Sequence, residues 1–337
     1  MTLREQRRRR DRAAEGGREQ TMVPRAEFRS YYGRPILKPP AWEWMVPAYL
    51  FTGGLSAGSA VLAAGADLTG RPALRRASSI GALASLAVSG YLLVADLGRP
   101  ARFHHMMRVA KPTSPMSMGT WILTAYGPGV GIAATSELLP TRLRQQWLGR
   151  PWLRWLPTVL TAVTRPAALS SAVVAPAVAS YTAVLLSQTA VPAWHEAHPY
   201  LPFIFSGSAA ASSGGLGMAL APVDEAGPAR AFAAYGGICE VAASRLMEKR
   251  LGVVVEAYHT GRAHTLRKWS EYLTIGGVLG TLAARRSRVA AIASGLALMA
   301  GSALQRFGVY EAGVASTKDP KYVVIPQRER LAQRQRP

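Results

Sequence analysis

Residues 45–66 read MVPAYLFTGGLSAGSAVLAAGA, a run that contains no charged side chain. A helix needs about 20 mostly apolar residues to cross the hydrocarbon core of a bilayer. Further long apolar stretches follow this one, so the sequence predicts an all-α bundle of about eight membrane-spanning helices. The expected ranges are 45–66, 78–95, 118–139, 167–191, 200–221, 228–246, 269–284 and 287–305.

Two features refine these ranges. Gly127-Pro128-Gly129 is expected to interrupt the third helix, and the fourth is expected to begin after Arg165-Pro166. The last two helices are expected to be short and tightly joined through Arg285, Arg286 and Arg288.

The composition supports a membrane domain between two basic tails. Apolar residues make up 49% of the chain and charged residues only 18%, whereas a globular domain usually carries about 25% charged residues. We therefore expect a basic, largely disordered tail at 1–40, a membrane domain at 41–310 and a basic C-terminal tail at 311–337.

The net charge of +21 has two interpretations. Nucleic-acid binding is one, but Lys and Arg also flank membrane helices and fix their orientation, which suits the uncharged stretches better. With eight spans, the side that holds both tails collects 26 Lys and Arg, against 12 on the other side. Both termini are therefore predicted to be cytoplasmic, in the inner (plasma) membrane, although the Arg-rich segment 140–166 runs against this count.

Paired glycines within two expected helices indicate close helix packing. Gly54 and Gly58 form one small-xxx-small pair, and Gly276 and Gly280 form another. In lipid, helices associate largely through close backbone contact at such residues.

Acidic and histidine side chains gather at one expected face of the membrane. Charges near a membrane core are costly and usually functional. Taken singly, each of these residues is better explained as a wet interfacial group, but the one-sided set as a whole favours a site. It comprises Glu43, Asp96, His104, His105, His195, Glu196, Glu240, Glu248, Glu256, His259 and Glu271, with Arg99 and Arg245 among them.

Such a set suits a quinone, whose head group needs hydrogen-bond partners and groups that exchange two protons. Tyr181, halfway along the fourth expected helix, is a candidate donor to that head group. A packing tyrosine with a satisfied hydroxyl is the equal alternative.

The sequence offers no evident redox centre of its own. Cys239 is the single cysteine, so no disulfide, zinc site or cysteine-held iron–sulfur cluster is expected, and its default role is inert packing. No histidine lies in the middle of a span, where a membrane haem takes its axial ligands. Any electrons must therefore pass to a partner that holds iron–sulfur clusters.

Several segments resemble one family, the NrfD/PsrC-type membrane subunits of polysulfide reductase-like complexes. The most specific are DLGRP at 96–100 and KPTSPMSMGTW at 111–121. The others are Tyr31-Tyr32-Gly33 with Pro35, Trp42-Glu43-Trp44, PAYLFTGGLSAGSA at 47–60, YTAVLLSQTAVPAWHEA at 181–197 and PKYVVIPQ at 320–327.

The resemblance implies an eight-helix subunit without haem, cluster or metal that binds menaquinone or ubiquinone. It implies two partners, a four-cluster ferredoxin-like iron–sulfur subunit and a molybdenum or tungsten bis-pterin catalytic subunit. Tyr181 matches the family's quinone-site tyrosine, whereas Tyr49 stands where one member has a histidine. The pattern is most similar to the version that accompanies formate dehydrogenase-like enzymes of actinobacteria in anaerobic respiration.

Together these observations predict a quinone-reactive membrane subunit that is not catalytic alone. Glu43, Tyr49 and Tyr181 are expected to contact the quinone. A second set is expected to handle protons: Asp96, Arg99, His195 and Glu240, extended by Arg245 and His259. A proton or solute transporter, and a purely structural anchor, are the rival hypotheses.

Overall fold

The computed structural model describes residues 35–150 and 152–334, and all regular secondary structure in these ranges is helical. The predicted disordered tail at 1–40 and the Tyr31-Tyr32-Gly33 motif lie almost wholly outside the described residues. The elements are α2 (Met45–Leu68), α3 (Pro72–Ala95), η1 (Pro100–Met107), α4 (Pro115–Leu138), α5 (Thr141–Leu148), α6 (Trp155–Ser187), α7 (Pro192–Glu196), α8 (Leu201–Leu220), α9 (Gly227–Arg250), η2 (Gly252–Tyr258), α10 (Gly261–Ala283), α11 (Arg288–Lys318) and α12 (Lys321–Arg334).

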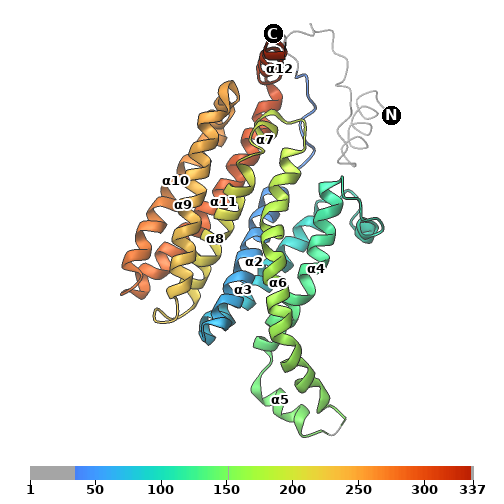
Figure 1. Ribbon diagram of the computed structural model, residues 1–337, viewed down its shortest axis with the longest axis vertical. Coiled ribbons are helices and arrows are strands. Elements are labelled where there is room, and N and C mark those ends of the chain that lie inside the picture. Colours follow the sequence, from blue (N-terminus) through green and yellow to red (C-terminus); the bar gives the residue numbers. More distant parts are fainter. Residues whose placement is uncertain (1–34, 151, 335–337) are drawn as a thin grey trace, which may run out of the picture.

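The long helices form two groups that meet along α2 and α8 (Figure 1). α2, α3, α4 and α6 pack together in one group, and α8, α9, α10 and α11 pack together in the other. Consecutive long helices run in opposite directions. We call the two ends of the bundle the α12 end, which also holds α7, and the α5 end.

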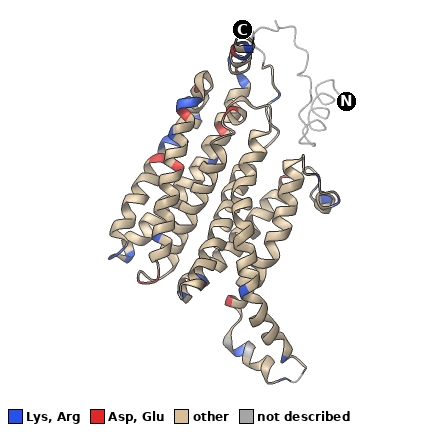
Figure 2. Ribbon diagram, viewed as in Figure 1, with Lys and Arg blue, Asp and Glu red and all other residues tan. Residues whose placement is uncertain are grey.

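Helices occupy all eight positions predicted for spans, and five of them are long and apolar enough to cross a membrane: α2, α3, α6, α8 and α11. α4, α9 and α10 fall short of this criterion, so the count of eight spans stays a prediction. Charge is part of the reason, because α9 carries Glu240 and Arg245 and α10 carries Arg267 and Glu271. Elsewhere charged residues gather mostly towards the two ends of the bundle (Figure 2).

The structure corrects the predicted course or length of four helices. α4 continues through Pro128 without interruption, and α6 begins at Trp155 and contains Pro166 rather than starting after it. Proline inside a membrane helix is tolerated where neighbouring groups satisfy the freed backbone. α10 and α11 are not short, having 23 and 31 residues.

Local sequence explains where many helices start. Proline occupies the first turn of α3, α4, α7, α8 and α9, where its missing N–H costs no helical bond. Ser114 and Ser287 cap α4 and α11, accepting hydrogen bonds from the N–H groups of Ser117 and Ala290. The tight joint between α10 and α11 lies at residues 284–287 and contains two of the predicted arginines, Arg285 and Arg286, while Arg288 begins α11.

The glycine pair of α2 packs against the second helix group as expected. A Cβ at Gly58 would lie 2.2 Å from Ser213 Oγ and 2.6 Å from the Ala209 carbonyl oxygen of α8. The second predicted pair is only half right. Gly280 meets Ser294 of α11, but no described atom lies within 4 Å of a Cβ at Gly276, and Gly277 makes the contact instead.

We predict that Gly58→Ala destabilises the protein while Gly65→Ala, on the same helix, does not. The new methyl at position 58 meets backbone, and overpacking costs about 1–3 kcal/mol, whereas a methyl at position 65 meets nothing within 4 Å. Thermal unfolding of the purified variants in detergent measures the difference. Equal melting temperatures for the two variants would contradict the tight α2–α8 contact.

Candidate functional site

The alternating helices bring most of the predicted site residues to the α12 end. Glu43 precedes α2, Asp96 follows α3, Arg99 precedes η1 and His195 lies in α7. Each of these four positions lies at the α12 end, because α2 begins there and α3 and α6 end there. The one-sided arrangement expected from the sequence is therefore present in the fold.

Three of the predicted residues form a compact group, which we call the phenol site: Tyr49, Tyr181 and Asp96. The Tyr49 hydroxyl of α2 and the Tyr181 hydroxyl of α6 lie close enough to interact, and the Asp96 carboxylate is close enough to act electrostatically on Tyr49. Tyr49 is buried and Tyr181 and Asp96 are half-buried. Two phenols and a carboxylate thus meet at the edge of the apolar layer.

Neighbouring helices fix the positions of both tyrosines. The Ser89 hydroxyl of α3 donates to the Tyr49 carbonyl oxygen at 3.3 Å. On the other side, the Tyr181 ring lies flush against Gly119 of α4, where a Cβ would come within 2.4 Å of Tyr181 Cε2. All four helices of the first group therefore contribute to the phenol site.

An aromatic stack joins the phenol site to the second helix group. The ring centroids of Trp42 and Trp194 are 5.7 Å apart, and those of Trp194 and Tyr310 are 6.0 Å apart. Trp194 Nε1 donates to the Val309 carbonyl oxygen at 2.8 Å, and the Tyr310 hydroxyl donates to the Trp42 carbonyl oxygen. Asp96 and Glu43 both act electrostatically on Tyr310, so the stack links the two predicted acids.

Sequence reasoning missed Trp194 and Tyr310. Trp194 stands beside His195 in the motif at 181–197, whose resemblance to the family was the available sequence signal. In the structure Trp194 is completely buried, as a structural anchor would be. Tyr310 lay beyond the expected end of the last helix at 305, although α11 in fact continues to Lys318.

Two other predicted residues lie at the α12 end but outside the phenol site. Arg99 and His195 are exposed. His195 Nδ1 lies 3.1 Å from the Ser187 carbonyl oxygen, and its ring neighbours His198. These contacts place His195 at the surface above α6 rather than against the tyrosines.

Glu240 belongs to the other helix group. It is 2% exposed, faces Arg306 of α11 electrostatically and lies close to Ser208. Arg306 is equally buried, donates to the Phe205 carbonyl oxygen at 2.7 Å and stacks 3.6 Å from the centre of the Phe205 ring. Among the described residues, Glu240 Oε2 and Arg306 Nε and Nη1 have no hydrogen-bond partner.

A polar crevice leads from the surface towards this Glu240–Arg306 pair. Its lining includes Ser244, Glu248, Arg267, Ser270 and Gln305, together with Arg245 at the outer edge. His259 contacts Glu248 at 3.4 Å, and Arg267 contacts the same carboxylate at 2.6 Å. Of the predicted companions of Glu240, Arg245 therefore lines the crevice, and His259 contacts Glu248 of its lining.

The α12 end is closed by contacts outside the spans. The Tyr258 hydroxyl of η2 donates to the Ala193 carbonyl oxygen at 2.8 Å, and burial raises the pKa of this phenol, so it remains a donor. A hydrogen bond to Glu256 raises the pKa of the Lys321 ammonium group. Arg330 of α12 pairs with Glu196 of α7 at 2.8 Å.

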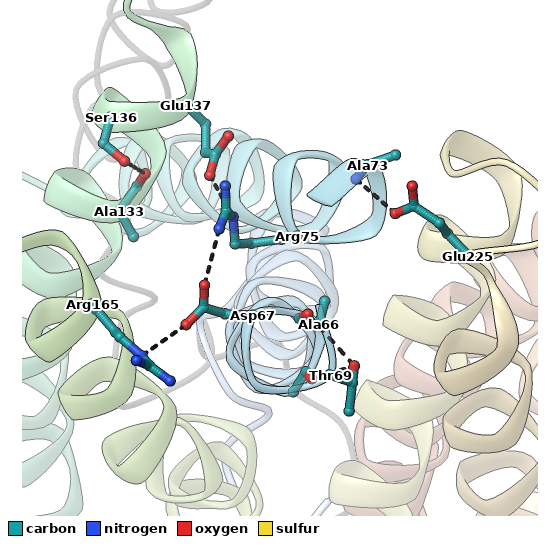
Figure 3. Close-up of polar contacts among 11 residues, drawn as sticks. Ala66, Asp67, Thr69, Ala73, Arg75, Ala133, Ser136, Glu137, Arg165 and Glu225 are labelled. Atoms are coloured by element: carbon teal, nitrogen blue, oxygen red, sulfur yellow. Dashed lines mark hydrogen bonds and ion pairs between the residues drawn. The ribbon is translucent and has the colours of Figure 1, made fainter. Parts of the chain in front are cut away.

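A second cluster of charges, to which the sequence analysis assigned no role, lies at the α5 end. Arg75 of α3 bridges Asp67 at 3.0 Å and Glu137 at 2.7 Å, while Arg165 pairs with Asp67 at 3.1 Å (Figure 3). Acids and arginines at the ends of neighbouring apolar stretches were the available signal. Within 35–150 and 152–334, no three His, Cys, Asp or Glu gather in a way that could hold a metal ion.

The fold and the site define a class: a helical membrane protein with a polar, aromatic site at one end of its bundle. The family model "Polysulphide reductase, NrfD" matches residues 37–223, more than half of the chain, and the chain belongs to this family. The matched range contains the phenol site, Glu43, Arg99 and His195, but not Glu240. The resemblance inferred from the sequence is confirmed at this level.

The chain is also similar to the C subunit of the polysulfide reductase of Wolinella succinogenes. The two are 29% identical over 184 residues, which cover 52% of this chain and 57% of the relative. The matching part thus spans little more than half of the relative's length. Nothing in this likeness separates a formate dehydrogenase-like subtype from other members, so that assignment stays a prediction.

We predict that Glu240→Gln lowers the stability of the protein much more than Arg245→Gln does. The first change leaves Arg306 as an uncompensated buried cation, and breaking a buried pair costs about 3–5 kcal/mol. The second breaks only the exposed Arg245–Glu271 pair, for which about 0–1 kcal/mol is typical. Thermal unfolding in detergent compares them, and an equal loss in both variants would refute the buried pair.

Proposed function

We propose that this chain binds a quinone or quinol at the phenol site and exchanges its electrons with an iron–sulfur partner. The observation that carries the proposal is the close approach of Tyr49 and Tyr181 beside Asp96, within the range that the family model matches. In this proposal the chain is not catalytic alone, because the electrons it takes from a quinol are used by its partners.

The donors and acceptors at the site suit a quinone head group. A bound quinol supplies two electrons and two protons when it is oxidised to quinone. Either phenol can donate a hydrogen bond to a head-group oxygen, and the Asp96 carboxylate can accept a proton. The Gly119 face holds the Tyr181 ring in place, which limits the reorganisation needed on binding.

The surroundings of the phenol site can accommodate the quinone tail and take up the protons of a quinol. An isoprenoid tail can lie along the apolar surfaces of the first helix group, whether it belongs to menaquinone or to ubiquinone. Glu43 stands exposed at the mouth and, with Arg99 and His195, can pass protons to water. Glu240 is proposed to serve a separate proton route, because its crevice opens in the second helix group.

The partners follow from the same proposal. Electrons from the phenol site require an acceptor at the α12 end, and the relative from Wolinella succinogenes is named as one lettered component of its reductase. We propose a four-cluster ferredoxin-like subunit there, followed by a molybdenum or tungsten bis-pterin catalytic subunit of formate dehydrogenase-like type. The Lys and Arg count supports a cytoplasmic α12 end. The family match does not favour the transporter alternative.

We predict that Tyr181→Phe and Gly119→Ala both weaken quinone binding. The first removes a hydroxyl, and a hydrogen bond is worth about 0.5–1.5 kcal/mol, or roughly 2- to 10-fold in affinity. The second inserts a methyl 2.4 Å from Tyr181 Cε2 and displaces the ring. Titration of the purified full-length chain with menaquinone-4, monitored by tryptophan fluorescence quenching, measures the affinity of both variants.

Asp96→Asn is expected to stop quinone-linked turnover in the assembled complex without preventing assembly.

Gly131→Ala on α4 is the matched control for Gly119→Ala, because no described atom lies within 4 Å of its Cβ. It should bind menaquinone-4 like the unaltered protein. Wild-type affinity in both Tyr181→Phe and Gly119→Ala would remove the phenol site from the proposed function.

A further inference from the structure

An apolar groove of about 330 Å³ runs between α9 and α10 on the outside of the second helix group. Ile238 and Val241 of α9 form one bank, and Ile275 and Leu279 of α10 form the other. α10 packs chiefly against α11 and much less against α9, which leaves the space between α9 and α10 open. Ile238 and Leu279 are exposed, so the groove faces the surroundings of the bundle.

A close contact between the two helices closes the floor of this groove. A Cβ at Gly237 would lie 2.4 Å from Val278 Cγ2 and 3.2 Å from Thr274 Cγ2. The missing side chain at position 237 therefore lets α10 approach α9 at the floor, while larger apolar side chains stand on the banks. In a bilayer, a groove of this kind meets the hydrocarbon, and its volume falls in the range typical of ligand sites.

One end of the groove carries positive charge. Arg245, one turn beyond Val241 on α9, is the single charged residue among the described residues that line it. Lys249 follows one turn further along the same face of α9, and Lys268 lies one turn before Tyr272 on α10. Both lysines are exposed, and no ion pair in the described part of the chain involves either of them.

The protein satisfies only part of the Arg245 guanidinium group. Its Nε and Nη2 lie 3.0 and 2.6 Å from Glu271 Oε1. A guanidinium group has five N–H donors, so the donors of Nη1 remain for an anion from outside the protein, and arginine is well suited to phosphate. The charges of Arg245 and Glu271 cancel, and Lys249 and Lys268 therefore leave a positive excess at this end of the groove.

Exposed aromatic side chains mark the same end as the surface of the membrane. Trp269 and Tyr272 of α10 are both more than half exposed and meet edge to face, with their ring centroids 6.3 Å apart. Lys268 Nζ lies 5.8 Å from the centre of the Tyr272 ring. Tryptophan and tyrosine are enriched at the level of the lipid head groups. The charged end of the groove is therefore at head-group depth, and its apolar part is within the hydrocarbon.

We propose that this groove binds an anionic phospholipid, with the phosphate at Arg245, Lys249 and Lys268 and an acyl chain between α9 and α10. The inference is independent of quinone binding at the phenol site. Basic pockets between membrane helices bind acidic lipid head groups. A lipid phosphate also stabilises a cation on the outer face of α9 that would otherwise be costly next to the hydrocarbon.

A helix from a partner or from a second copy of the chain fits the groove less well. Helices associate in lipid at small residues, whereas the banks consist of branched side chains. Such a helix would also have to bring an acid to Arg245 within the membrane, which is costly. A phospholipid carries its phosphate at the required depth. A soluble phosphate would gain nothing from the apolar part of the groove.

Native mass spectrometry of the purified full-length chain in detergent tests the head-group contacts. Phosphatidylglycerol should bind more tightly than phosphatidylcholine with the same acyl chains. Replacing both lysines, Lys249→Gln with Lys268→Gln, should weaken phosphatidylglycerol binding at least about tenfold, because each cation at the membrane surface attracts the anionic lipid. Arg250→Gln with Arg262→Gln is the matched control. It removes two exposed charges near the same ends of α9 and α10 but on other faces, and it should bind like the unaltered protein.

Ala242→Phe tests the acyl chain. Ala242 lines the groove, so a phenyl ring there should fill it and lower the affinity for phosphatidylglycerol, whereas Ala293→Phe at an exposed position of α11 should not. Equal affinity in the lysine and arginine double variants, or unchanged binding in Ala242→Phe, would overturn the proposal.

Three competing occupants give different results. Displacement of phosphatidylglycerol by glycerol phosphate alone would assign the site to a soluble phosphate, and displacement by menaquinone-4 would assign it to a quinone. A dimer of the chain that Ala242→Phe dissociates would make the groove an interface between copies. Each of these results would overturn the lipid site.

Discussion

The close approach of α2 to α8 is the constraint on which the rest of the structure depends. In a bilayer, helices gain little by burying apolar surface against each other, so contact between small residues must hold them together. Gly58 allows α2 to lie against Ala209 and Ser213 of α8. α2 also carries Tyr49 of the phenol site and, at its other end, Asp67 of the charge cluster. The contact between α2 and α8 therefore helps to position the polar residues at both ends of the first helix group.

The positions of the helices were predictable from the sequence because the physics of spanning a membrane is local. An apolar stretch of sufficient length predicts a helix whatever it packs against, and all eight stretches are helical. The helix limits were less accessible. Pro128 and Pro166 look like breaks in a sequence, yet both lie inside helices, because neighbouring groups in the bundle can satisfy the freed backbone.

In the candidate site, too, the features that depend on local sequence were predictable, whereas those that depend on helix packing were not. The one-sided placement of Glu43, Asp96 and His195 follows from counting spans, and the bundle reproduces it. Tyr49 and Tyr181 come together from helices that are far apart in the sequence, so no spacing rule reveals their approach. Arg306 was missed for a related reason: a charge normally ends an apolar stretch, but here Glu240 and the Phe205 ring neutralise and shield it within the bundle.

The two helix groups each contain a buried polar system, and the two systems come close at one point. A Cβ at Gly54 of α2 would lie 3.2 Å from Arg306 Nη2, only a few residues along α2 from Tyr49 and Ser56. Buried charges and unsatisfied hydroxyls weaken a membrane bundle that apolar side chains would hold equally well. Their presence on both sides of α2 is therefore a cost in stability that packing does not explain.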